Sequence, residues 1–294
     1  MRCFSNRKFG AEIEINDTQD DRNFIAAIIS FTCSKENRKC EMYISDWEQS
    51  INNTFWHIKT DSSCGWEICT PVSSGYKDLF LIEKVFRTID NWHFSADERC
   101  GFHIHVDVSD FDEYQMGILF NRWIKIEKYL LKLVPNHRRN NLHCLPYYNS
   151  NWFTGYFAKA NISSPCEIWN SVCPTNFSPH NNPQKRYTLN FVNFAKFLSR
   201  EKEGLSTKHC RKTLELRLPE GTLNSEDITN WIKLFVNFID VAKNCRKLGD
   251  IEFVKTQKQF FKICGLNEDK NNTLSQGLLE TKKWVIKREN LFKN

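Results

Sequence analysis

The sequence lacks any apolar run long enough for a signal peptide or a membrane span. Its first residues lead almost directly into Phe9-Gly10-Ala11-Glu12, and no window approaches the ~20 apolar residues of a transmembrane helix. The chain has 12 cysteines but no CxxC pair, so a zinc or disulfide framework is not indicated. Free thiols are expected in a reducing compartment. We therefore expect a cytoplasmic protein that has no membrane partner.

Several nucleotide-binding and hydrolase motifs are also missing. There is no GxxxxGK[ST] sequence and no GxGxxG sequence, which excludes a P-loop or Rossmann site for a nucleotide. The HExxH helix of many zinc hydrolases is absent as well. The net charge of +6 is spread along the chain without a long basic block. This charge suits an anionic ligand such as a nucleotide, but it favours nucleic acid only weakly, so we do not expect nucleic acid as a partner.

Residues 100–107 alternate strictly between apolar and polar side chains, which predicts a β-strand. Its polar face would carry His103, His105 and Asp107. Residues two apart on a strand are separated by about 6 to 7 Å, which is long for two ligands of one small ion. We therefore expect His105 to have a role different from that of His103. A solvated polar strand face is the alternative interpretation.

Three further alternating runs place charged side chains on one strand face. A charged edge strand that discourages aggregation would explain any one of them, but not the recurrence. If the strands share one sheet, the like charges require bound cations, and oxygen ligands favour Mg²⁺ or Mn²⁺. The residues are Glu12 and Glu14 in 9–15, Glu67 in a hairpin formed by 55–60 and 66–71, and Glu215 and Arg217 in 213–219.

The rest of the chain is predicted to be mainly helical, with two polar segments. We expect residues 35–53 to be irregular, and residues 135–185, rich in Asn, Pro and aromatics, to form a packed lid or substrate loop. The aromatics of this loop are Trp152, Phe153, Tyr156, Phe157 and Trp169. Helices are expected at about 22–34, 76–92, 116–133, 225–242, 250–264 and 275–292, and a strand at 186–191. We expect one catalytic domain over residues 1–294, with 250–294 as a C-terminal helical extension.

Five ordered motifs resemble those of the amidoligase family, which belongs with glutamine synthetase and glutamate-cysteine ligase among the carboxylate-amine ligases. The resemblance covers residues 9 to about 245. The motifs are Phe9-Gly10-Ala11-Glu12-Ile13-Glu14, Gly65-Trp66-Glu67-Ile68-Cys69-Thr70-Pro71 after Asp61-Ser62, Cys100-Gly101-Phe102-His103-Ile104-His105-Val106, Arg186-Tyr187-Thr188-Leu189-Asn190, and the run from Thr213 to Leu223.

The resemblance implies an α+β fold, a curved and mainly antiparallel glutamine synthetase-like sheet with helices on its outer face. The concave face would bind ATP and Mg²⁺ or Mn²⁺. It implies that Glu14 and Glu67 hold the metal nearer the carboxylate substrate, and that Glu12, His103 and Glu215 hold the metal at the nucleotide phosphates. Arg217 would contact the transferred phosphoryl group and, with Arg186 and Glu67, make up the catalytic set. His103, His105, Asn190 and Arg217 would bind the nucleotide.

The implied reaction joins an acid to an amine through an acyl phosphate, because a carboxylate must first take a phosphoryl group to become reactive. The substrates would be small-molecule, peptide or protein carboxylates and amines. Two alternatives stay open. One is a zinc-dependent hydrolase that uses His103 and His105, although the carboxylates are too many for one zinc ion. The other is a non-catalytic nucleic-acid-binding protein, which would leave the charged strand faces unexplained.

Overall fold

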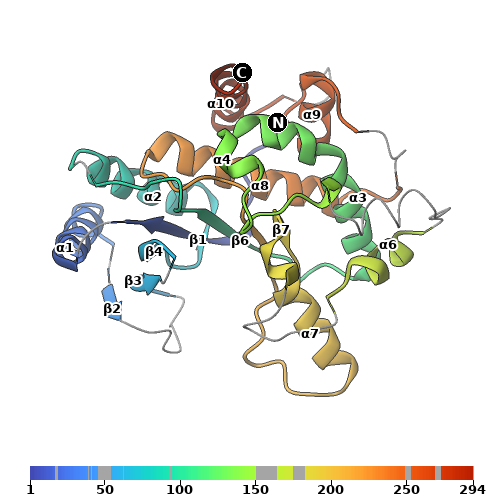
Figure 1. Cartoon of the computed structure of the whole chain (residues 1–294), viewed down its shortest axis with the longest axis horizontal. Helices are drawn as coiled ribbons and strands as arrows, with labels where there is room; N and C mark the ends of the chain where they lie inside the picture. The colour runs from blue at the N-terminus through green and yellow to red at the C-terminus, as the bar shows by residue number, and fades with distance from the viewer. Residues whose placement is uncertain are drawn as a thin grey trace. The chain divides into compact units, whose positions relative to one another are not determined.

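The structure is a computed structural model of the chain (Figure 1). The chain divides into two compact units. The sheet unit comprises Phe4–His105 and Pro219–Lys233, and the helix unit comprises Met1–Cys3, Val106–Leu218 and Leu234–Asn294. The residues that the structure describes are 1–16, 19–38, 40, 42–45, 54–61, 63–92, 94–149, 164–174, 183–248, 253–268 and 273–293.

The sheet unit is built on five neighbouring strands in the order β2-β3-β4-β1-β6, and a short sixth strand, β5, pairs with β1. The pairings β1–β4, β3–β4 and β1–β5 are antiparallel, and β2–β3 is parallel. The mixed α/β fold and its mostly antiparallel pairing confirm this part of the prediction. The strands are β1 (Lys8–Ile15), β2 (Met42–Ser45), β3 (Trp56–Asp61), β4 (Gly65–Cys69), β5 (Ser73–Ser74) and β6 (Phe102–Asp107).

One face of these strands is apolar and carries two helices, α1 (Gln19–Lys35) and α2 (Gly75–Asp90), which pack against each other (Figure 1). The Phe86 ring of α2 lies 6.3 Å from the Trp56 ring of β3. The guanidinium of Arg22 in α1 lies 4.6 Å from the Trp66 ring of β4. Since side chains alternate along a strand, burying this face against the helices leaves the charged residues on the other.

The helix unit packs several helices around α3 (Glu113–Leu130), whose apolar stripe was predicted at 116–133. Gly117 lies so close to the start of α6 that a Cβ atom at this position would be 1.8 Å from the Pro165 carbonyl oxygen. The other elements of this unit are η1 (Leu131–Leu133), α4 (Asn136–Arg139), η2 (Tyr147–Asn149), α6 (Pro165–Val172), η3 (Pro183–Arg186), β7 (Leu189–Asn190), α7 (Val192–Lys202), β8 (Thr213–Leu216), α9 (Gln257–Cys264) and α10 (Gln276–Leu291).

Helix α8 (Ser225–Lys243) begins in the sheet unit and ends in the helix unit. The side chain of Asn224 accepts a hydrogen bond of 3.1 Å from the Asp227 backbone N–H, which is an N-cap arrangement. Strand β6 likewise begins in the sheet unit and ends in the helix unit. In the sheet unit Phe102 donates its N–H to the Pro219 carbonyl, and in the helix unit Val108 donates its N–H to the Lys212 carbonyl.

Three expectations about local structure need correction. Residues 42–45, expected to be irregular, form strand β2, since their backbone pairs with β3. The strand expected at 186–191 is reduced to Leu189–Asn190, followed at once by helix α7. The segment 135–185 contains helix α6, whose capping box joins Ser164 and Glu167 and whose Trp169 is buried.

The aromatics Trp152, Phe153, Tyr156 and Phe157 lie outside the described residues, so the role of 135–185 as a lid stays a prediction, as does the single-domain assignment. The helix predicted at 275–292 is confirmed as α10, whereas the one predicted at 250–264 is shorter, because α9 begins only after its N-cap residue Thr256. All twelve cysteines are free thiols, as expected. In the part of the chain that the structure describes, no helix is both long and apolar enough to cross a membrane.

Candidate functional site

Three carboxylates lie together on the polar face of the sheet unit. Glu14 on β1 is directly opposite Glu67 on β4, and Glu12 is opposite Cys69. Directly opposed residues of an antiparallel pair have Cβ atoms about 4.5 to 5.5 Å apart. Glu14 and Glu67 are almost completely buried, at 7% and 5% exposed, and Glu12 is partly buried. Such an arrangement concentrates negative charge where little water can screen it.

His103 on β6 lies between the two glutamates of β1. Its Nδ1 atom is 3.8 Å from Glu12 Oε2, and its Nε2 atom is 3.7 Å from Glu14 Oε1. The strand pairing sets this position, because the Glu14 backbone N–H donates to the Gly101 carbonyl and the Gly101 N–H donates to Glu14 Oε2. The predicted convergence of Glu12, Glu14 and His103 is therefore present in this unit.

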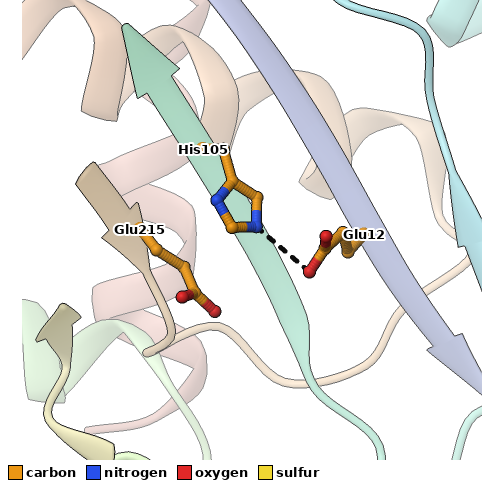
Figure 2. Close-up of side chains that lie close together, drawn as sticks. All are labelled: Glu12, His105 and Glu215. Atoms are coloured by element: carbon orange, nitrogen blue, oxygen red, sulfur yellow. Dashed lines mark ion pairs between the residues drawn. The ribbon is translucent and has the colours of Figure 1, made fainter. Parts of the chain in front are cut away.

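His105 on β6 lies closer to Glu12 than His103 does. Its Nε2 atom lies 3.0 Å from Glu12 Oε2 (Figure 2). Burial by itself raises the pKa of Glu12, but His105, His103 and Lys59 together hold that pKa well below its usual value. Glu12 is thus an ionised carboxylate at neutral pH. His103 and His105 share Glu12 as a partner, and His103 also lies beside Glu14, so a difference in their roles stays a prediction.

The pKa of Glu67 is shifted in the opposite direction to that of Glu12. Burial and the negative charges of Glu12 and Glu14 raise the pKa of Glu67 well above its usual value, although Lys59 opposes this shift. Lys59 Nζ lies 3.3 Å from Glu67 Oε2, and burial raises the pKa of the Cys69 thiol, which donates to Glu67 Oε1 at 3.4 Å. The cluster therefore has more negative charge than its own cations neutralise.

Two groups of side chains within the sheet unit have the spacing needed to hold a metal ion. Glu12, Glu67 and Cys69 form one, with ligand atoms all within 4.8 Å of one another, and Glu14, Asp61 and Cys64 form the other. Because Cys69 is a thiol rather than a thiolate, the first group offers mainly carboxylate oxygens, which are ligands for hard ions such as Mg²⁺ and Mn²⁺.

The remaining predicted site residues belong to the helix unit. Asn190 on β7 and Glu215 on β8 face each other in an antiparallel pair, and Asn190 Nδ2 donates to Glu215 Oε2 at 2.6 Å. Arg217 Nη1 forms an ion pair with Glu215 Oε1, and its Nε donates to the His143 carbonyl at 3.3 Å. Arg186 ends η3 with an exposed side chain. Convergence of these residues with the carboxylates of the sheet unit stays a prediction.

Three side chains of this face were not identified from the sequence: His57, Lys59 and Cys69. The register of the predicted hairpin could have identified them. When β3 and β4 are joined at Asp61 and Gly65, Lys59 lies opposite Glu67 and His57 lies opposite Cys69. Burial and the neighbouring Lys59 lower the pKa of His57. His57 is therefore a neutral imidazole at neutral pH.

The fold and this face define a mixed α/β protein with a buried carboxylate and imidazole cluster on a mostly antiparallel sheet. A protein-family model described as "Putative amidoligase enzyme" matches residues 5–239. The chain therefore belongs to this amidoligase family, and the family name indicates an enzyme of the ligase class. A search of curated proteins found no match to the sequence.

Proposed function

We propose that the protein is an ATP-dependent carboxylate-amine ligase that acts through an acyl phosphate on a glutamine synthetase-like sheet. The observation that carries the proposal is the convergence of Glu12, Glu14, Glu67 and His103 on one face of the sheet unit of an amidoligase-family chain. In this proposal the four residues, together with Glu215, hold Mg²⁺ or Mn²⁺.

The electrostatics of the cluster support bound cations. A carboxylate such as Glu67, whose pKa is raised by burial and by two neighbouring glutamates, becomes a better ligand once a divalent ion offsets their repulsion. The donors are mostly carboxylate oxygens with one imidazole, which suits hard octahedral ions better than zinc. When bound, ATP and its ions supply the phosphoryl group and neutralise the charge that develops during transfer.

The chain's own residues would bind and orient the reactants. Arg217 has a planar fork of donors that can contact two phosphoryl oxygens at once, and Glu215 together with the His143 carbonyl fixes its orientation. In this proposal His103, His105 and Asn190 contribute with Arg217 to nucleotide binding, and Arg186 and Glu67 belong with Arg217 to the catalytic set. The substrates would be carboxylates and amines from small molecules, peptides or proteins.

Because all twelve thiols are free, we propose a reducing compartment such as the cytoplasm.

A metal-dependent melting experiment tests the proposal. Ions that bind only the folded protein stabilise it by mass action, so millimolar Mg²⁺ or Mn²⁺ should raise the melting temperature by several degrees, and ATP should increase the effect. Glu14→Gln should reduce this response while the protein stays folded. Glu98→Gln, an exposed position of the same unit, is the matched control and should respond like the wild type.

The same measurement separates the alternatives. A melting temperature that neither Mg²⁺ nor Mn²⁺ changes, with and without ATP, contradicts the proposed metal site. A protein that is purified with tightly held zinc, and melts lower once the zinc is chelated, supports the hydrolase alternative instead. Stabilisation by an oligonucleotide without any metal response supports the nucleic-acid alternative.

A further inference from the structure

Lys59 is a buried strand residue with a positive charge on the polar face of the sheet unit, and the proposed reaction does not yet use it. Its side chain is 10% exposed, and its Nζ atom lies 3.3 Å from Glu67 Oε2. A lysine buried to this extent is uncommon unless it is paired. Its position is fixed by the hairpin register, since Lys59 is opposite Glu67 on β3 and β4.

The strand pairings place Lys59 at the end of a row of charged residues. Glu14 on β1 is opposite Glu67 on β4, which is in turn opposite Lys59 on β3. Glu67 therefore has a like charge on one side and an opposite charge on the other. A divalent ion bound to Glu67 would lie close to the Lys59 ammonium, because both cations would use the same carboxylate.

We propose that Lys59 is a built-in cation that partly occupies Glu67 and thereby weakens the binding of a divalent ion on that side of the cluster. The proposal rests on the metal binding proposed above. Lys59 is a positioning residue, because it acts on the ion through Glu67. Its positive charge also offsets the negative charge of the cluster in the protein without the ion.

The expected size of the effect follows from Coulomb's law. A monovalent and a divalent cation about 5 Å apart repel each other enough to change affinity by about tenfold even at the dielectric constant of water, and more in a buried site. Removing the lysine charge should therefore tighten ion binding by at least about tenfold. The cost is a less stable protein without the ion, because Glu14 and Glu67 then repel each other without compensation.

The test is a Mn²⁺ titration without ATP or substrate, followed by calorimetry and by the electron paramagnetic resonance signal of free Mn²⁺. Lys59→Met keeps most of the side-chain volume and removes the charge, and it should bind Mn²⁺ at least about tenfold more tightly than the wild type. Lys59→Arg keeps the charge and should bind like the wild type. Lys84→Met is the matched control, because Lys84 also belongs to the sheet unit but pairs with Glu36 at 2.5 Å.

Unchanged or weaker Mn²⁺ binding by Lys59→Met would overturn the inference. If Lys59→Met is unfolded in chelator and folds when Mn²⁺ is added, the ion replaces the lysine as proposed. If Lys59→Met does not fold even in excess Mn²⁺, the ion cannot replace the lysine charge, and the inference is wrong. If the wild type and Lys59→Met bind Mn²⁺ equally tightly, only the role of Lys59 is refuted and the proposed function stands. If neither protein binds Mn²⁺, with or without ATP, the proposed function is refuted as well.

Discussion

Asn190 Nδ2 donates a hydrogen bond of 2.6 Å to Glu215 Oε2, from a strand only two residues long to its antiparallel neighbour. The Oδ1 atom of the same amide accepts the Val192 backbone N–H at 2.9 Å, so both ends of the Asn190 side chain are used. Glu215 is 5% exposed and has Arg217 on its other oxygen. Asn190 thus fixes the carboxylate that orients Arg217.

This arrangement leads to a prediction for Arg217→Lys. Lysine can keep the charge beside Glu215 but cannot reproduce the planar donors of arginine, so we expect ATP turnover to fall by at least about a hundredfold. The melting temperature should change little, because lysine keeps a positive charge beside the buried Glu215 carboxylate. The measurement is ADP release with an accepted acid, alongside a melting curve.

The control is Arg87→Lys, which alters a surface ion pair with Glu83 on α2. It should leave both turnover and melting unchanged. Turnover close to that of the wild type in a folded Arg217→Lys protein would mean that Arg217 is only the ion-pair partner of Glu215.

Glu127 in the helix unit allows a prediction about pH. It is fully buried, and its carboxylate accepts the backbone N–H groups of Tyr147 and Tyr148 and the Trp123 indole N–H, while the Thr188 hydroxyl also donates to it. Burial raises the pKa of Glu127 above its usual value, although these donors oppose the shift.

For an acid whose pKa is raised by folding, the folded state holds the proton more tightly than the unfolded chain. The contribution of Glu127 to stability is therefore complete below the unfolded pKa of about 4.3, and it declines as the pH rises through the folded value. Glu127→Gln cannot titrate. We expect the free energy of unfolding of the wild type, relative to Glu127→Gln, to decrease as the pH rises from 4 toward the folded value.

Urea denaturation at several pH values measures this difference, and Glu201→Gln at an exposed position of α7 should reproduce the wild-type pH dependence. An advantage of the wild type over Glu127→Gln that grows with pH would mean that the four donors outweigh burial. Glu127 would then be ionised more readily in the folded protein than in the unfolded one.

Gly117 yields a prediction about packing. Alanine has the higher helix propensity, but a Cβ atom at this position in α3 would overlap the Pro165 backbone at the start of α6. Gly117→Ala should therefore lower the free energy of unfolding by about 1 to 3 kcal/mol, as overpacked cores do. Gly10→Ala is the matched control, since a Cβ there meets nothing within 4 Å. A Gly117→Ala protein as stable as the wild type would show that α6 moves away without cost.

The sequence predicted those parts of the fold whose pattern is local. Alternation located β1 and β6, and the turn residues after Asp61 located the hairpin of β3 and β4. Strand β2 was missed because its pairing with β3 joins segments that no local pattern connects. Helix α7 was missed because only Phe191 separates it from the two residues of β7, so the apolar run near 190 was interpreted as part of a strand.

The candidate site was only partly predictable for a similar reason. Glu12, Glu14, Glu67 and His103 could be selected because each is charged or polar on an alternating strand. Lys59 could not be recognised from its own run, since a single lysine on a half-buried strand is usually solvated. Only the register of the hairpin shows that it lies against Glu67.

The most direct test of the central claim is the identity of the nucleotide product. Amino acids and short peptides are screened for acids that stimulate ATP turnover, with hydroxylamine in place of the unknown amine, and the nucleotides are separated by chromatography. If the acid attacks the γ-phosphorus, ADP and phosphate form, and hydroxylamine traps the acyl phosphate as a hydroxamate. Release of AMP and pyrophosphate with a productive acid would contradict the proposed mechanism.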